Sequence, residues 1–316
     1  EYNPKNAAIW DDFVRESSNG TIFHLQKFLS YHPPDRFNHR HLLFSKRGKL
    51  IAVVPGVDWS ENNQRIYISH RGASYGGIVQ KEGVGIRDAI KLVSLLVGWC
   101  KSQGFNKIIL TPTPEIYFSE VHNHIGFALY NYGFRFIKRE LTSVVSLKSS
   151  LKENFMLFKP EARTSTRKAI KQGLEVKISE DWEDFYTVLE KNLSLRHNVK
   201  PTHTLEELLK LRSLFPEDIL LFGCYYKDKL IAGVVVFVAN PRVLLAFYIS
   251  HNQDYQRYRP VNLLFYRIME WGIERDYKYL DFGTYTLNME PNLGLAKFKE
   301  GFGALGRFRD TYYLNL

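Results

Sequence analysis

Residues 221–237 read Leu-Phe-Gly-Cys-Tyr-Tyr-Lys-Asp-Lys-Leu-Ile-Ala-Gly-Val-Val-Val-Phe, and this stretch decides the fold. Two apolar runs joined by a short basic turn are typical of a β-hairpin. Residues 42–55 repeat the pattern as Leu-Leu-Phe-Ser-Lys-Arg-Gly-Lys-Leu-Ile-Ala-Val-Val-Pro, and the tetrapeptide Lys-Leu-Ile-Ala occurs in both hairpins. The chain therefore contains an internal repeat.

The order of elements after each hairpin is also repeated. A further strand contains an Ile-Ser-His triplet, at residues 68–70 and again at residues 249–251, and a polar loop follows it. Apolar residues at spacings of three and four then predict a helix near residues 86–102 and another near residues 261–275.

Each helix leads into one more strand, at residues 107–110 in the first half and 277–281 in the second. Residues 134–147 alternate in the manner of a strand and are expected to complete the first sheet. An ordered series of this kind predicts two copies of one α/β domain with mixed sheets. We place the two domains at residues 1–147 and 148–316.

Length and composition agree with two globular domains. A chain of 316 residues is long enough for two separate cores, and 45% hydrophobic with 15% aromatic residues excludes a disordered chain. The formal net charge of +10 indicates an anionic partner such as a phosphate, a nucleotide, RNA or an acidic lipid. A basic surface that only keeps the protein soluble is the alternative.

The chain has only two cysteines, Cys100 and Cys224, far apart in apolar stretches. They can form neither a disulfide framework nor a cysteine metal site, so a reducing, cytoplasmic location is expected. No apolar run approaches the roughly 18 to 20 residues that a transmembrane helix needs, so no transmembrane segment is expected.

A basic segment, residues 151–178, leads into the second domain. Residues 159–173 read Lys-Pro-Glu-Ala-Arg-Thr-Ser-Thr-Arg-Lys-Ala-Ile-Lys-Gln-Gly, which predicts a short helix. Such a helix places Arg163, Arg167 and Lys171 on one face, four residues apart. This row is suited to a phosphate backbone or a pyrophosphate of a donor, or it is a solvated face between domains.

A second cationic position follows the next predicted helix, residues 182–192. Residues 195–198 read Leu-Arg-His-Asn, before another helix at residues 205–214. Arg196 thus lies where a helix ends and a loop begins, a position suited to binding an anionic substrate, with His197 beside it. A surface arginine without a ligand is the alternative.

Residues 279–302 contain a strand end followed by a polar loop, and they read Tyr-Leu-Asp-Phe-Gly-Thr-Tyr-Thr-Leu-Asn-Met-Glu-Pro-Asn-Leu-Gly-Leu-Ala-Lys-Phe-Lys-Glu-Gly-Phe. The pattern predicts a buried strand, a glycine turn, a polar loop, and then Lys297 and Lys299 on either side of Phe298. Strand ends and charged loops are where α/β proteins place functional groups. Asp281, at the strand end, is either a cap of the next turn or a proton acceptor.

The order of hairpin, strand, polar loop, helix and strand resembles the GNAT acyltransferase fold, and two copies in tandem resemble the Fem-type (FemABX) peptidyltransferases. Four stretches carry the resemblance: the basic helix at residues 163–173, Asn-Leu-Ser-Leu-Arg-His-Asn at 192–198, Lys-Leu-Ile-Ala-Gly at 229–233, and Asp-Phe-Gly at 281–283 followed by Phe-Lys-Glu-Gly-Phe-Gly at 298–303. The resemblance covers nearly the whole chain.

The resemblance implies a reaction and roles for some residues. Fem-type enzymes transfer an aminoacyl group from aminoacyl-tRNA to an amine of the stem peptide of a peptidoglycan precursor, and their relatives use acyl-CoA. By resemblance, Phe298 and Lys299 contribute to stabilising the transfer intermediate, and Arg196 helps to hold the phosphates of the precursor. No metal and no bound redox cofactor is implied, and the donor is either aminoacyl-tRNA or acyl-CoA.

The chemistry fits these residue types. Aminolysis of an ester or thioester passes through a tetrahedral oxyanion, and a fixed cation such as Lys299 lowers the barrier by a few kcal/mol. The attacking amine must also lose a proton, for which Asp281, Glu300 or the leaving group of the donor are the possible acceptors.

The loop before the second repeated helix departs from the GNAT pattern. GNAT domains bind the CoA pyrophosphate with a glycine-rich loop, whereas residues 252–261 here contain no glycine. Arg257 and Arg259 of this loop remain candidates for binding a phosphate by their side chains. Besides the Fem-like enzyme, two alternatives stay open: an acyl-CoA-dependent N-acyltransferase, and a non-catalytic module that binds RNA or an anionic precursor.

Overall fold

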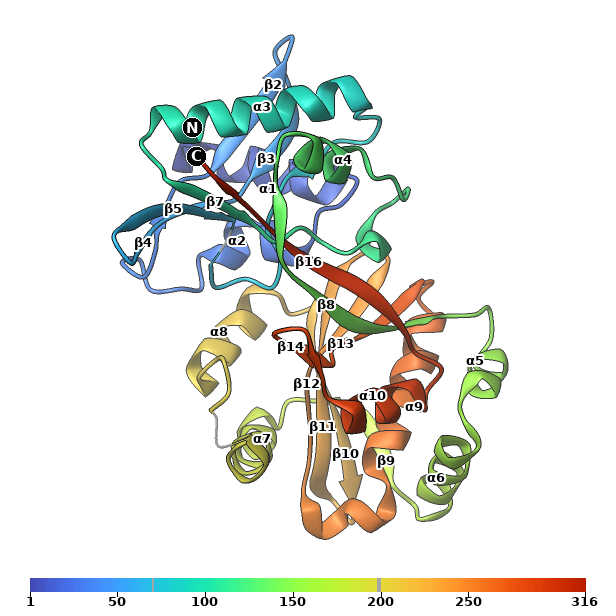
Figure 1. Ribbon diagram of the computed structural model, residues 1–316. Coiled ribbons are helices and arrows are strands. Elements are labelled where there is room, and N and C mark those ends of the chain that lie inside the picture. The colour runs from blue at the N-terminus through green and yellow to red at the C-terminus, as the bar shows by residue number, and fades with distance from the viewer. Residues whose placement is uncertain (70, 198–199) are drawn as a thin grey trace. The chain divides into compact units, whose positions relative to one another are not determined.

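The structure is a computed structural model, and it describes residues 1–69, 71–197 and 200–316, with residues 195–197 described by their backbone alone. The chain folds as two compact units, residues 1–141 with 307–316, and residues 142–306 (Figure 1). Two long strands, β8 (Arg135–Ser146) and β16 (Leu305–Asn315), each contribute residues to both units. The division therefore falls inside strands, whereas the sequence placed a single boundary after residue 147.

Unit 1 combines a mixed sheet with a smaller antiparallel one. The mixed sheet has the order β1-β4-β5-β7-β16, and β2, β3 and β6 form a separate three-stranded sheet. Its elements are η1 (Pro4–Asn6), α1 (Ala7–Glu16), η2 (Ile22–His24), α2 (Gln26–Leu29), β1 (Asn38–His39), β2 (Leu42–Lys46), β3 (Lys49–Val54), β4 (Val57–Glu61), β5 (Gln64–Ser69), β6 (Val79–Gln80), α3 (Ile86–Ser102), β7 (Lys107–Leu110), η3 (Glu115–Tyr117) and α4 (His124–Asn131).

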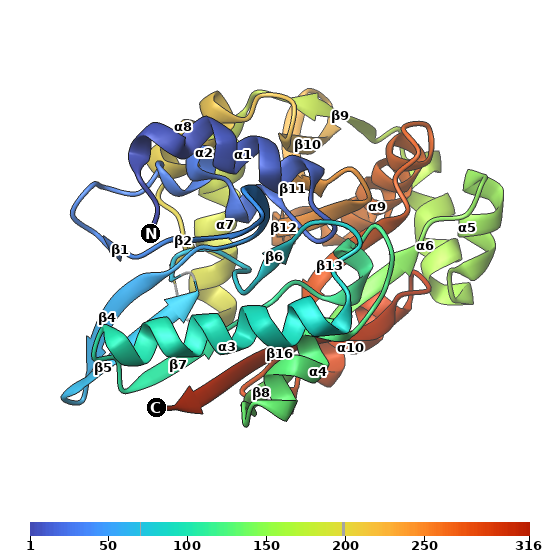
Figure 2. The same cartoon turned by 90° about the horizontal axis from the view of Figure 1, so that it is seen from above.

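Unit 2 is built on a sheet with the order β8-β13-β12-β11-β10-β9. Helices α7 and α8 cover one face of this sheet, and α5, α6 and α9 lie on the other (Figures 1 and 2). Its elements are α5 (Leu151–Leu157), α6 (Pro160–Lys171), β9 (Glu175–Ser179), α7 (Trp182–His197), α8 (Leu205–Leu214), β10 (Ile219–Tyr226), β11 (Lys229–Asn240), β12 (Val243–His251), η4 (Gln253–Tyr258), α9 (Pro260–Ile273), β13 (Tyr279–Thr284), β14 (Thr286–Leu287), β15 (Glu290–Pro291) and α10 (Leu293–Glu300).

The repeat predicted from the sequence is present as a repeated βαβ unit. In unit 1, α3 connects β5 to the parallel strand β7, and in unit 2, α9 connects β12 to the parallel strand β13. The hairpins differ, however, because β2 and β3 belong to the small separate sheet, whereas β10 and β11 belong to the main sheet of unit 2. The histidine of the first Ile-Ser-His triplet, His70, lies outside the described residues.

Strand β8 bears out one expectation in part. Residues 134–147 were expected to complete the first sheet, and β8 does lie beside β16, with its first half in unit 1. Its second half, however, pairs with β13 in unit 2, with Ser146 opposite Tyr279 and Thr142 opposite Thr284. A strand of twelve residues is long enough to serve two units. Local alternation of apolar residues predicts a strand but not its partner.

The apolar residues of the repeated elements form the cores. In unit 2, β11 is buried from Leu230 to Ala239, and α9 packs its apolar face, including Leu264 and Ile268, on that sheet. Burial on both faces explains why these strands read as continuous apolar runs. Among the described residues, no helix combines the length and the hydrophobicity that crossing a membrane requires.

The parallel strands β12 and β13 pair only over a short distance. Val243, Leu244 and Leu245 face Tyr279, Leu280 and Asp281, and beyond these three pairs the strands have no mutual register. The backbone groups at the end of β13 are therefore able to bind other partners. The carbonyl oxygens of Gly283 and Thr284 accept hydrogen bonds from the side chain of Lys299 on α10.

Candidate functional site

Strand β13 contains a β-bulge at its end. Asp281 pairs with Val144 and Thr284 pairs with Thr142, so two residues of β13 lie opposite one residue of β8. One of these two, Gly283, has a φ of +73°, a left-handed conformation that favours glycine. The bulge breaks the alternation of carbonyl directions that a regular strand would have.

The bulge places two successive carbonyl groups around the ammonium group of Lys299. The Nζ atom donates to the carbonyl oxygens of Gly283 and Thr284, each at 2.8 Å. The lysine lies in the last turn of α10 and is only 2% exposed. Its burial lowers its pKa to about 8, and the negative charge of Asp281 acts in the opposite direction.

Asp281 is fully buried and organises the same bulge. Its Oδ1 accepts a hydrogen bond from the backbone N–H of Gly283 at 2.8 Å and another from the hydroxyl of Thr142. The first of these bonds is the turn cap that the sequence offered as one of two roles for Asp281. Thr142, itself buried, was not singled out from the sequence, because it lies in another strand 139 residues before Asp281.

Phe298 is partly buried and packs against the core of unit 2. Its ring contacts Phe302 edge-on, with centroids 5.2 Å apart, and lies 6.4 Å from the ring of Phe265 on α9. The aromatic side chain thereby anchors the last turn of α10. Lys297, on the other side of Phe298, is exposed.

An ammonium group has three N–H donors. Among the residues that the structure describes, the two bulge carbonyls are the only hydrogen-bond acceptors of Lys299. Within the described residues, one N–H of this buried cation therefore has no acceptor, which is the chemical feature that a site for a developing oxyanion needs.

The basic helix α6 forms as predicted, but two of its cations contact the neighbouring helix α5. The guanidinium of Arg163 donates to the sulfur of Met156 at 3.8 Å, and that of Arg167 lies 5.5 Å from the ring centroid of Phe155. Lys171 is exposed at the end of the helix. In the described part of the chain, no hydrogen bond or ion pair joins this row to Lys299.

The loop before α9 carries its two arginines on the surface. Arg257 donates to the hydroxyl of Tyr258 at 3.1 Å, and Arg259 has a left-handed backbone with a φ of +61°. Pro260 is the first residue of α9. Because proline has no N–H, this helix start offers fewer backbone donors to an anion than a glycine-rich loop does.

Arg196 and His197 occupy the last turn of α7, so the helix extends beyond the predicted end at residue 192. Their side chains lie outside the described residues, and their predicted role in binding a substrate stays a prediction.

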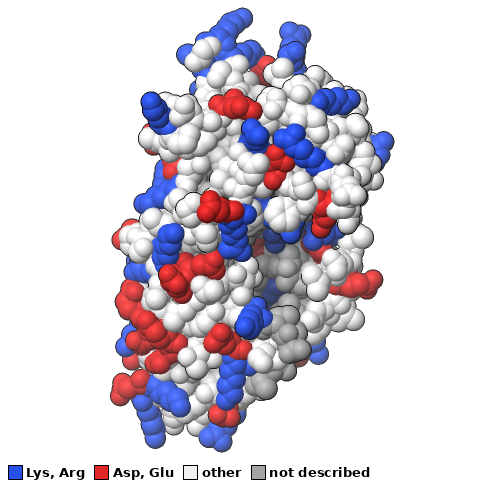
Figure 3. All heavy atoms as spheres, turned by 90° about the vertical axis from the view of Figure 1, so that its left-hand side faces the viewer, with Lys and Arg blue, Asp and Glu red and all other residues white. Residues whose placement is uncertain are grey.

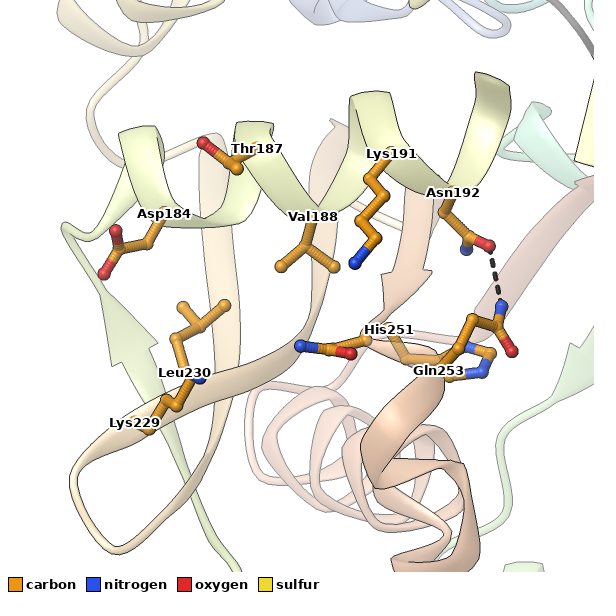
Figure 4. A pocket seen from close by; sticks show the side chains of 10 residues that line it. Asp184, Thr187, Val188, Lys191, Asn192, Lys229, Leu230, His251 and Gln253 are labelled. Carbon is orange, nitrogen blue, oxygen red and sulfur yellow. Dashed lines mark hydrogen bonds between the residues drawn. The ribbon is translucent and has the colours of Figure 1, made fainter. Parts of the chain in front are cut away.

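A pocket of about 280 Å³ lies along α7 (Figure 4). Lys191 points from the helix into it, and Asp184 and Lys229 lie near its other end. Gln253 and Asn192 close one side with a hydrogen bond of 2.9 Å. None of the candidate catalytic or ligand-binding residues lines the pocket, although Asn192, Lys229 and His251 come from stretches that the sequence singled out. The pocket lies on the α7 side of the sheet, whereas Phe298 of α10 packs on the α9 side.

The surface charge is mixed. On the face shown in Figure 3, lysine and arginine side chains are interspersed with aspartate and glutamate side chains. The excess of positive charge therefore does not form a continuous basic band on this face, and a polyanion would contact acidic groups there as well.

Comparison with known proteins identifies part of this fold. Residues 159–300, which include β13, the bulge and α10, match the family model of the acetyltransferase (GNAT) domain. This part of the chain is similar to a GNAT domain. No curated protein sequence matches the chain.

Solved structures extend the similarity beyond the GNAT domain. The crystal structure of FemX has 14% identity and a TM-score of 0.77 over 98% of this chain and 96% of that chain. The C-terminal domain of a putative lysylphosphatidylglycerol synthetase from Agrobacterium fabrum has 14% identity and a TM-score of 0.63, over 99% and 92%. A tandem GNAT protein from the clavulanic acid biosynthesis pathway has 10% identity and a TM-score of 0.56, over 99% and 95%. The predicted tandem-GNAT, Fem-like fold is thereby confirmed.

Proposed function

We propose that this protein is an acyltransferase that moves an aminoacyl or acyl group from an ester or thioester donor to an amine, with Lys299 stabilising the oxyanion. The observation that carries the proposal is the buried ammonium group, of which two N–H groups have acceptors among the described residues and the third has none there. Two carbonyl oxygens fix its position before any substrate binds, so little reorganisation is needed during the reaction.

The amine nitrogen attacks the carbonyl carbon, the C–O or C–S bond of the donor breaks, and the nitrogen loses a proton. Asp281 already accepts two hydrogen bonds, and Glu300 pairs with Lys159 at 3.0 Å. The leaving oxygen or sulfur of the donor is therefore the acceptor that we favour for this proton.

Within this reaction class we favour a Fem-like donor and acceptor, an aminoacyl-tRNA and a nucleotide- or lipid-linked peptidoglycan precursor. The high TM-score to FemX over nearly both whole chains supports this choice. The glycine-free loop with Pro260 at the start of α9 is a poor match for a CoA pyrophosphate. An acyl-CoA donor held by the exposed side chains of Arg257 and Arg259 is the second candidate.

Lys299→Ala tests the proposal. We expect kcat to fall about 100-fold or more with either donor, because loss of one oxyanion donor typically costs a few kcal/mol. Lys278→Ala removes an exposed lysine just before β13 and serves as the matched control. Transfer that stays at the wild-type rate in Lys299→Ala would refute the role of this lysine.

The donor is tested separately, with aminoacyl-tRNA and acyl-CoA as alternative substrates of the wild type. The double variant Arg163→Ala with Arg167→Ala probes the predicted role of α6. If α6 holds tRNA, the variant raises KM for aminoacyl-tRNA and weakens salt-dependent RNA binding, while turnover of acyl-CoA is unchanged. RNA binding without transfer from either donor would favour the non-catalytic module instead.

A further inference from the structure

The position of Lys299 depends on the shape of the bulge rather than on an ion pair. Its two hydrogen bonds go to backbone carbonyls of residues 283 and 284, and both oxygens reach the same Nζ atom. In a regular strand, neighbouring carbonyls point to opposite sides. The left-handed Gly283 removes this alternation, so any residue that fixes Gly283 also fixes the lysine.

Two buried side chains fix the bulge. The carboxylate of Asp281 binds the N–H of Gly283, within β13, and the hydroxyl of Thr142 on β8 binds the same carboxylate oxygen. Thr142 also pairs with Thr284 across the strands, so it contacts the bulge on both sides of the extra residue. Exposure of 0% for Asp281 and 1% for Thr142 keeps water from replacing these bonds.

We propose that Thr142, Asp281 and Gly283 are positioning residues that aim the ammonium group of Lys299 at the reacting carbonyl through the β13 bulge. The inference rests on the proposed function of Lys299 and adds the residues that make this function possible. None of the three touches the substrate in this proposal. They act by holding two carbonyl oxygens where the lysine needs them.

The charges around Lys299 make the proposal sensitive to pH. Burial lowers the pKa of Lys299, and Asp281 is the charged group that raises it. On α10 itself, Glu300 is exposed and paired with Lys159, and Lys297 is exposed. Removing the charge of Asp281 therefore moves the titration of Lys299 to lower pH.

Three substitutions remove one part of the positioning unit each. Thr142→Val keeps the shape of the side chain and removes the hydroxyl. Asp281→Asn removes the charge. Gly283→Ala adds a methyl group with no atom nearer than the carbonyl oxygen of Ala246 at 3.9 Å, so it tests the left-handed backbone and not the space. Thr142→Ser is the conservative variant that retains the hydroxyl.

We expect Thr142→Val and Gly283→Ala to lower kcat about 10-fold or more with little change in KM, because misplacement of a reacting group acts on the transition state. Thr142→Ser should restore most of the rate. Asp281→Asn should lower kcat and also move the alkaline limb of the pH–rate profile to lower pH. If the three residues only stabilised the fold, all variants would have a lower melting temperature, and the alkaline limb of the pH–rate profile would stay where it is in the wild type.

A second measurement does not depend on catalysis. The free energy of unfolding is measured from pH 7 to pH 10.5 in the wild type, in Asp281→Asn, and in both after addition of Lys299→Met. The difference in pH dependence between a protein with Lys299 and the same protein with Lys299→Met is the contribution of the Lys299 titration to the free energy of unfolding. In the Asp281→Asn background, this contribution should change at lower pH than in the wild type.

The outcomes separate the two ideas. If Lys299→Ala leaves transfer unchanged but Asp281→Asn still shifts the titration of Lys299, the proposed function fails while the link between Asp281 and the lysine stands. If Asp281→Asn and Thr142→Val leave kcat, the alkaline limb and the titration of Lys299 unchanged, the positioning unit is refuted. Should Asp281→Asn fail to fold, the comparison of Thr142→Val with Thr142→Ser decides.

Discussion

At the scale of single residues, the protonation of Lys299 is the feature with the clearest consequence. Its pKa of about 8 keeps the ammonium group charged at neutral pH and allows it to lose the proton in mildly alkaline solution. The proposed oxyanion site needs the charged form. We therefore expect kcat to decline as pH rises through about 8, and this decline, measured as a pH–rate profile, should follow one deprotonation.

The same deprotonation of Lys299 should raise the free energy of unfolding as pH increases, whereas it lowers kcat. A lysine in the unfolded chain has its ordinary pKa, so between the two values the unfolded state binds more protons than the folded state. The unfavourable contribution of Lys299, on the order of 3 kcal/mol, is fully present below pH 8 and disappears as pH rises toward 10.5. Lys299→Met should stabilise the protein near pH 7 and flatten this part of the curve. A Lys299→Met variant with the wild-type pH dependence would contradict the assigned pKa.

At the scale of elements, the close packing of α7 on β11 gives a testable contrast between two glycines. A Cβ at Gly233 would lie 2.5 Å from the ring of Phe185 on α7, whereas a Cβ at Gly98, in the exposed part of α3, meets no atom within 4 Å. Gly233→Ala should therefore lower the free energy of unfolding by roughly 1–3 kcal/mol, because the core has no room for the methyl group.

The matched variant Gly98→Ala should raise the free energy of unfolding by about 0.5–1 kcal/mol, because alanine loses less backbone entropy in a helix than glycine does. Denaturant unfolding of both variants checks the pair. Two changes of the same sign would show that helix or strand propensity, and not the contact with Phe185, dominates at Gly233.

Only one of the two repeated βαβ units carries the lysine. After β7 in unit 1 the chain continues as Thr-Pro-Thr-Pro-Glu at residues 111–115, whereas β13 in unit 2 continues through the bulge to α10. A duplicated fold thus carries the proposed chemistry in one copy, since a fold alone does not confer an activity.

At the scale of the whole molecule, the two cysteines report on the two units separately. Cys100 lies in the core of unit 1 and Cys224 in the core of unit 2, and burial raises the pKa of both thiols to about 12. Neither should react with a thiol reagent at pH 8 while its unit is folded.

Single-cysteine variants, Cys100→Ser and Cys224→Ser, turn this protection into a measurement of unfolding. Because β8 and β16 each contribute residues to both units, we expect both thiols to become reactive over the same range of denaturant concentration. Labelling of one thiol well before the other would show that the units unfold independently.

The sequence by itself determined the periodic and repeated features. Spacings of three and four residues predicted α3 with the bounds that the structure shows and α9 within two residues, because helix periodicity is a local property. The repeated order of elements predicted two copies of one α/β domain, and the resemblance to GNAT and Fem-type proteins predicted the tandem-GNAT fold. The lysine pair around Phe298 also stood out, because a charged pair beside a glycine turn is visible in one short stretch.

Only the tertiary structure decided how those features combine. The pairing of β8 with β13 brings Thr142 to Asp281, and no local pattern contains this information, because 139 residues separate the two. The bulge at Gly283 and its two carbonyls around Lys299 likewise depend on the register between strands. Sequence patterns specify which residues form a helix or a strand, whereas long-range strand pairing specifies which polar groups meet inside the protein. In this protein, the pairing of β8 with β13 holds the bulge whose carbonyl groups bind Lys299, and this makes the lysine a candidate site.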